Sequence, residues 1–154
     1  SGFSAAASVV AHDETYTSFT AWVAGNFAAA EQVNAAISGP GADPEGCGLT
    51  NLERYAFDLP ARGHIASPVA SAISGTGSDQ RLALTFPRKG YAPGLSYTVQ
   101  SSTDLVTWTD RQTILPGYPK TFTFTDTVAV TFAARRFLRV RITQAVSIDD
   151  APRR

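Results

Sequence analysis

Along the second half of the chain, hydrophobic and polar residues alternate with a period of two. Six segments carry this pattern and are rich in Thr, Val, Phe and Tyr: residues 69–74, 81–86, 95–101, 107–115, 120–125 and 136–143. Alternation of this kind is typical of strands with one buried face. Turn residues such as Gly, Pro and Asp separate the segments. The pattern therefore predicts a mainly β fold, with an antiparallel β-sandwich over residues 69–146.

The alternation also assigns the faces of the predicted strands, because successive side chains of a strand point to opposite sides. The residues expected to face the core are Leu82, Leu84, Phe86, Leu95, Tyr97, Val99, Phe122, Phe124, Leu138, Val140 and Ile142. Residues 102–105 are expected to form a helical turn between two strands. That turn would place Leu105 and Trp108 over the edge of the core.

The first part of the chain follows a helical period instead. Phe19, Trp22, Val23 and Phe27 recur at spacings of three and four, which predicts a helix over residues 16–27. A second helical piece is expected over residues 28–37, and a third after Thr50, with Glu53 as its capping-box partner. A small α-helical segment is thus predicted over residues 1–59, a linker rich in Pro, Gly and Ser over 60–68, and a tail over 147–154.

The stretch DPEGCGLTNLERYAF, residues 43–57, has the spacing of a calcium loop that runs into a helix. Such loops use oxygen ligands at positions 1, 3, 5, 7, 9 and 12, with Gly at position 6. With Asp43 as position 1, Glu45, the backbone carbonyl of Leu49 and Asn51 can still supply oxygen. Cys47 is a soft ligand at position 5, and Arg54 stands where a bidentate carboxylate belongs.

The loop therefore resembles a degenerate EF-hand, and we expect it to keep its shape without calcium. No metal or other cofactor is favoured, because few anionic oxygens remain. If calcium does bind, the ligands would be Asp43, Glu45, Leu49 and Asn51. A specific hypothesis is that the guanidinium of Arg54 turns back into the loop and pairs with Asp43 or Glu45, as a tethered cation.

Charge is balanced overall but unevenly distributed. Residues 1–70 carry two basic and seven acidic residues, a net charge of −5, and residues 71–154 carry a net charge of +5. Two explanations stay open: the halves dock on each other, or the basic half meets an anionic partner. Nucleic acid is not expected as a partner, because the net charge is zero. No apolar run is long enough to span a membrane.

No catalytic motif is found, and the protein is not expected to be an enzyme. Two candidate binding surfaces remain. The first is aromatic, with Trp108, Tyr91 and Tyr118 in or near loops, where flat rings can stack on sugars; alternatively, Trp108 is a core residue and the tyrosines anchor loops. The second is Arg139 and Arg141 on the outward face of the last strand, suited to carboxylate or sulfate groups. Alternatively, these arginines pair with the acidic half or guard a sheet edge.

Taken in order, several motifs resemble those of C-terminal accessory modules of large secreted or surface bacterial proteins, many of which degrade or adhere to polysaccharides. The motifs are DPEGCGLTNLERYAF, LTF at 84–86, YTVQSSTDLVTW at 97–108 and RRFLRVRI at 135–142. The loop is similar to dockerin and thrombospondin type-3 calcium loops. The resemblance implies a secreted or cell-surface location, a larger parent protein, and non-catalytic binding to polysaccharide or a cell-surface glycan, without membrane insertion. A purely structural or surface-sorting role is the alternative, and a small glycan hydrolase is least favoured.

Overall fold

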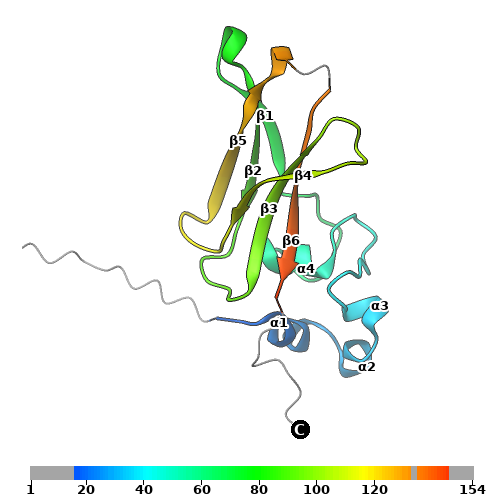
Figure 1. The fold of residues 1–154 in the computed structure, drawn as a ribbon. Helices are drawn as coiled ribbons and strands as arrows, with labels where there is room; N and C mark the ends of the chain where they lie inside the picture. Colours follow the sequence, from blue (N-terminus) through cyan, green and yellow to red (C-terminus); the bar gives the residue numbers. More distant parts are fainter. Residues whose placement is uncertain (1–15, 133–134, 146–154) are drawn as a thin grey trace, which may run out of the picture.

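The computed structural model describes residues 16–132 and 135–145. Two three-stranded antiparallel sheets face each other, and four short helices gather at one end of them (Figure 1). The mainly β fold predicted from the alternation is confirmed. The predicted tail, residues 147–154, lies outside the described residues.

The two sheets have the orders β1-β2-β5 and β4-β3-β6. The first contains β1 (Ala70–Ser74), β2 (Arg81–Pro87) and β5 (Thr121–Ala129); the second contains β4 (Thr109–Ile114), β3 (Leu95–Ser102) and β6 (Phe137–Gln144). Two 3-10 turns, η1 (Gly77–Asp79) and η2 (Val130–Phe132), lie close together beyond the ends of the first sheet. In the second sheet Tyr97 lies opposite Ile114 on one side and Ile142 on the other. The pairing places β6 at a sheet edge.

The strand boundaries agree with the sequence pattern to within a few residues, with two differences. Strand β5 continues to Ala129, beyond the predicted end at residue 125. Residues 103–107 form bends and no helical turn. The predicted helical turn at 102–105 is therefore wrong. The physical reason is that Leu105 adopts a φ of 63°, in the left-handed region, which no right-handed helical turn contains.

The helices are short, and their caps explain where they begin. Helix α1 (Phe19–Asn26) starts after Ser18, whose hydroxyl accepts the N–H of Ala21. The predicted piece over residues 28–37 is split into α2 (Ala29–Gln32) and α3 (Ala35–Ser38). The split occurs because the Asn34 side chain accepts the N–H of Ala36 and so starts a new helix.

Helix α4 (Asn51–Ala56) begins as predicted, with a capping box. The Thr50 hydroxyl accepts the N–H of Glu53, and the Glu53 carboxylate accepts the N–H of Thr50 at 2.8 Å. Both ends of this arrangement satisfy backbone donors that the first helical turn leaves unpaired. The box thereby fixes the direction in which α4 leaves the loop.

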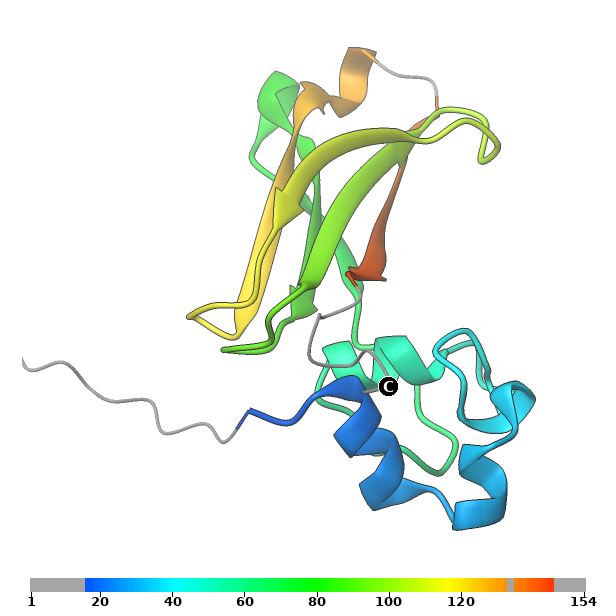
Figure 2. The same ribbon diagram turned by 60° about the horizontal axis from the view of Figure 1, so that its bottom comes forward.

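Helix α4 carries aromatic residues into the core of the sheets, so the helical part and the sandwich share one hydrophobic cluster. Phe57 lies 6.5 Å from Phe86 and 6.3 Å from Tyr97, measured between ring centroids. The buried hydroxyl of Tyr97 donates to the Ala56 carbonyl at 2.6 Å and accepts the N–H of Lys89 at 2.9 Å. Figure 2 shows the helices gathered at this end of the sheets. The core is thereby closed at one end by a helix.

The predicted inward faces are largely confirmed. Every residue on that list is either buried in this cluster or packed against it, apart from Leu82, which lines a hollow at the side of the sandwich. Charge also joins the two parts, since Lys89 of the β2–β3 loop pairs with Asp58, two residues after the end of α4. This ion pair favours the first explanation of the uneven charge, that the two halves of the chain dock on each other. No helix in the described part of the chain is long and apolar enough to cross a membrane.

Candidate functional site

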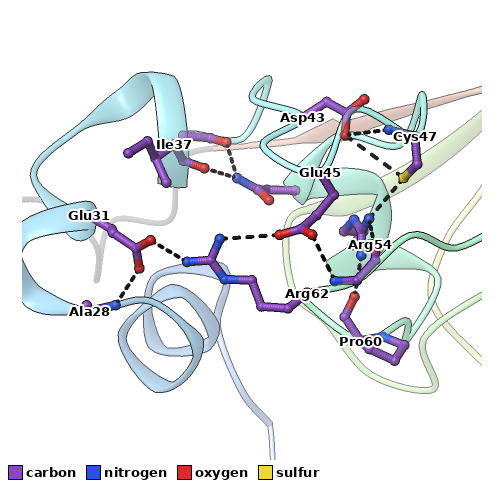
Figure 3. Close-up of polar contacts among 12 residues, drawn as sticks. Ala28, Glu31, Ile37, Asp43, Glu45, Cys47, Arg54, Pro60 and Arg62 are labelled. Carbon is purple, nitrogen blue, oxygen red and sulfur yellow. Dashed lines mark hydrogen bonds and ion pairs between the residues drawn. The ribbon is translucent and has the colours of Figure 1, made fainter.

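The loop before α4 is organised around the side chain of Arg54, which is fully buried. One terminal nitrogen, Nη1, donates to the carbonyl of Pro60 at 2.8 Å. The other, Nη2, donates to the carbonyl of Gly63 at 2.7 Å and to the sulfur of Cys47 at 2.9 Å (Figure 3). The guanidinium thus lies inside the loop, as hypothesised, and joins the loop to residues 60–63.

The hypothesised partners of Arg54 are wrong, however. The carboxylate of Asp43 is turned to the backbone, where it accepts the N–H of Gly48 at 2.7 Å and the N–H of Cys47 at 3.3 Å. The Gly48 N–H lowers the pKa of Asp43 most, and the Cys47 N–H lowers it further against the opposing effect of burial. Backbone donors, which the sequence pattern does not reveal, satisfy this charge in place of Arg54.

Glu45 also has other partners. Its carboxylate accepts the N–H of Gly63 at 3.1 Å and pairs with Arg62 at 3.4 Å. Arg62 in turn pairs with Glu31 at 2.6 Å, so a chain of charges connects α2, the loop and residues 60–63 (Figure 3). The guanidinium carbon of Arg62 also lies 4.4 Å from the ring centroid of Phe27, a cation–π contact.

The remaining candidate ligands also have structural roles. The Asn51 side chain is fully buried and donates to the carbonyls of Ile37 and Gly39 at 2.8 and 3.0 Å. The Leu49 side chain is also buried. Among the described residues, no group of three or more His, Cys, Asp and Glu side chains could hold a metal. With a guanidinium in the place of the bidentate carboxylate, these residues do not fit a calcium ion.

Cys47 is partly buried beside Arg54. The backbone N–H of Ile65 lowers the pKa of its thiol most. Burial raises that pKa, whereas the N–H of Leu49 and the Arg54 guanidinium lower it further. The sulfur therefore acts as a weak acceptor for Nη2 of Arg54.

A second site lies on the outer face of the β4–β3–β6 sheet. The guanidinium carbon of Arg139 lies 4.0 Å from the ring centroid of Trp108, a cation–π contact. Arg139 also donates to the Gln100 amide oxygen at 2.8 Å, and the Gln100 amide nitrogen donates to Asp110 at 2.6 Å. Asp110 pairs with Arg141 at 3.6 Å. Three of the five predicted ligand-binding residues are therefore brought together here.

Hydroxyl groups continue this polar surface towards the other end of the strands. Ser96 and Thr143 share a hydrogen bond of 2.7 Å, and Thr98 and Thr113 share one of 3.2 Å. Both pairs lie directly across from each other in the sheet register. Thr98 and Gln100 of the central strand are buried. The exposed polar groups of this face therefore belong to β4 and β6 and include Thr113, Arg141 and Thr143, which can bind a ligand with many hydroxyl groups.

The β3–β4 loop positions Trp108. The Asp104 carboxylate accepts the N–H groups of Thr107 and Val106 and the hydroxyl of Ser102. These bonds, led by that of Thr107, lower the pKa of Asp104 to about 2. The indole N–H of Trp108 donates to the carbonyl of Leu105 at 3.3 Å. The loop is therefore held by its own hydrogen bonds instead of a helical turn.

The other two predicted residues lie elsewhere. Tyr91, in the β2–β3 loop, is 60% exposed, and its ring is 5.6 Å from that of Tyr16. Tyr118, in the β4–β5 loop, is also exposed. Both loops lie at the opposite end of the strands from the β3–β4 loop (Figure 1). The tyrosines therefore do not share a surface with Trp108.

Sequence reasoning missed two residues of the outer face, Gln100 and Asp110. Gln100 carried a signal, because it alternates with inward Tyr97 and Val99 and therefore occupies an outward position of the predicted strand. Elsewhere, the buried Asp126 of β5 is bridged to Arg136 by two hydrogen bonds. Burial is the largest single influence and raises the pKa of Asp126, but Arg136 and the backbone N–H groups of Val128 and Thr127 together lower that pKa by more, and the net direction is downward. The sequence pattern does not predict this ion pair, because the two side chains meet only in the folded protein.

Comparisons with known proteins give no relatives: no protein-family model, no curated protein and no solved structure matches this chain.

Proposed function

We propose that this chain is a non-catalytic accessory module of a secreted or surface bacterial protein, and that it binds polysaccharide weakly through the outer face of the β4–β3–β6 sheet. The observation that supports this best is the gathering of Trp108, Arg139 and Arg141 on one face. The location and the larger parent protein rest on the motif resemblance.

The chemistry of the face suits a saccharide. An indole ring supplies an apolar platform for the C–H face of a sugar, and the exposed side chains of Asp110 and Arg141 supply polar groups for its hydroxyls. Arg139 already covers one side of the Trp108 ring. A sugar would therefore contact the edge or the second side of the ring, next to a hollow of about 250 Å³ that Trp108, Leu105 and Phe137 line.

Retention on polysaccharide gels tests the proposal. Gels containing neutral, uronic-acid or sulfated polysaccharides are run with the wild type and with Trp108→Ala. We expect retention by at least one polysaccharide and about tenfold weaker binding in the variant, because aromatic anchors dominate such interfaces. Tyr91→Ala is the matched control, since it removes an exposed ring at the other end of the strands. It should bind like the wild type.

Two outcomes would overturn the proposal. One is that the wild type is retained by none of the polysaccharides. The other is that Tyr91→Ala loses as much retention as Trp108→Ala, which would move the binding surface away from this face. Trp108→Phe, which keeps a ring, checks that any loss does not arise from a disturbed β3–β4 loop.

A second function, a purely structural or surface-sorting role, is favoured by a different observation. The helices close one end of the sandwich through a shared core, with Tyr55, Phe57 and Tyr97 in one cluster. A rigid closed unit suits a module that only caps or displays a larger protein. Binding to an outer-membrane extract without retention on any polysaccharide would favour this role over the first.

A further inference from the structure

Strand β6 has one free edge. Among residues 16–132 and 135–145, β3 is the only strand that pairs with β6. Within the same residues, no backbone hydrogen bond reaches residues 137–144 from the side opposite to β3. In an antiparallel pair, every second residue of an edge strand directs its N–H and C=O away from its partner. Strand β6 therefore presents a row of unpaired backbone groups.

Two hollows follow this edge one after the other. A hollow of about 250 Å³ is lined by residues 136–138 together with Leu82 and Trp108. A hollow of about 340 Å³ is lined by residues 139–142 together with Leu52 and Glu53 of α4. Consecutive residues line both, although their side chains point to opposite faces of the sheet. The hollows must therefore run along the edge of the strand, where both faces can be reached.

The arginines of β6 do not guard this edge. Edge strands are commonly protected by charged side chains that project past them or by proline. Here Arg139 is drawn back across the sheet face to Gln100, and Arg141 is drawn back to Asp110. No proline occurs between residues 137 and 144. The opposite side of the sandwich differs, because Arg111 of β4 bonds to Thr127 of β5 at 2.8 Å and bridges the two sheets.

We propose that the edge of β6 is a docking site for an extended peptide of another protein, which adds to the β4–β3–β6 sheet as a further strand. Side chains of the peptide would alternate between the two faces. Those beside Leu138, Val140 and Ile142 are expected to be apolar, because these residues face the core. Those beside Arg139 and Arg141 are expected to be acidic.

The length of the edge sets the length of the ligand. The two hollows together cover residues 136–142. An extended peptide of about seven residues, at ~3.3 Å per residue, matches that span. The partner is therefore an extended segment in which apolar and acidic residues alternate. The edge shares Trp108 and the hollow of about 250 Å³ with the proposed sugar site. The two proposals differ in their ligand and in their dependence on backbone hydrogen bonds.

A fluorescent peptide of alternating Val and Glu tests the proposal by fluorescence anisotropy. Two further peptides carry N-methyl groups, one at every Val and the other at every Glu, which removes one half of the backbone donors at a time. We expect binding by the parent peptide and by one of the N-methylated peptides, with loss in the other. Binding or loss in both N-methylated peptides would overturn strand addition, because only alternate residues face the edge.

Charge is tested with two reversals in the protein. Arg141→Glu should weaken binding about tenfold at low salt, and less at high salt. Arg111→Glu is the matched control on the far side of the sandwich and should bind like the wild type. Equal weakening by both would show a general charge effect and overturn the site.

Polysaccharide retention by the Arg111 and Arg141 variants is measured in parallel, so a failure of the sugar proposal remains distinguishable. A dimer of the free protein that the peptide does not disperse would assign the edge to a second copy of the chain and overturn the proposal.

Discussion

Replacing Arg54 with alanine should destabilise the protein far more than replacing any exposed arginine of the same region. The substitution removes three hydrogen bonds, two of them to backbone carbonyls, from a side chain with no exposed surface. A buried carbonyl left without a partner costs about 1–3 kcal/mol. The substitution also removes the cost of burying a charged guanidinium, whose Nε is buried without a partner. That gain offsets part of the loss.

The balance of these effects is a loss of about 3–5 kcal/mol in the free energy of unfolding. For a chain of this size, each kcal/mol lowers the melting temperature by roughly 2–4 °C. The expected drop for Arg54→Ala is therefore on the order of 10 °C. Arg54→Lys should recover only part of it, because an ammonium group cannot reproduce the forked geometry.

Arg62→Ala is the control. Its side chain is 41% exposed, and it pairs with Glu31 and Glu45 and lies over Phe27. Exposed contacts of this kind contribute little, so we expect a loss of about 1–2 kcal/mol. Urea denaturation followed by circular dichroism measures both variants. The reasoning is refuted if Arg54→Ala costs no more than Arg62→Ala.

Three further predictions test other parts of the structure. Tyr97→Phe should cost about 1–3 kcal/mol by urea denaturation, because it leaves the Ala56 carbonyl and the Lys89 N–H unpaired in the core; an unchanged midpoint would contradict this. The folded-state pKa of Asp126 lies below its ordinary value of 3.8, so the stability from its pair with Arg136 is present above about pH 4 and is lost as pH falls through the lower pKa. Asp126→Asn should thus flatten the acid limb of a stability–pH curve, and an identical curve would count against it. Millimolar calcium should leave the melting temperature of the wild type unchanged, and a rise of several degrees would restore the calcium interpretation.

The strands could be predicted because one buried face imposes a period of two that survives in the sequence. The capping box of α4 was equally local, since Thr50 and Glu53 are three residues apart. The β3–β4 loop was mispredicted, because Asp104 binds backbone N–H groups that compete with a helical turn. Local patterns therefore predicted the elements but not every connection between them.

Contacts between distant segments could not be predicted. The pattern placed Arg54 in the loop, but two of its three partners are carbonyl groups at residues 60 and 63, which have no sequence signature. The candidate site was predicted in part: Trp108, Arg139 and Arg141 were each named, but only the registers of β3 with β4 and with β6 bring them onto one face. Gln100, which joins Arg139 to Asp110, follows from the same registers.

The partners of Arg54 also affect how this protein could be traced among distant sequences. A carbonyl is supplied by every amino acid, so the identity of residue 60 can drift without removing the bond that Arg54 makes there. A change at position 54 itself removes three hydrogen bonds at once. Relatives are thus best sought by an arginine at the end of the loop, and not by the identity of residue 60, which it binds through the backbone.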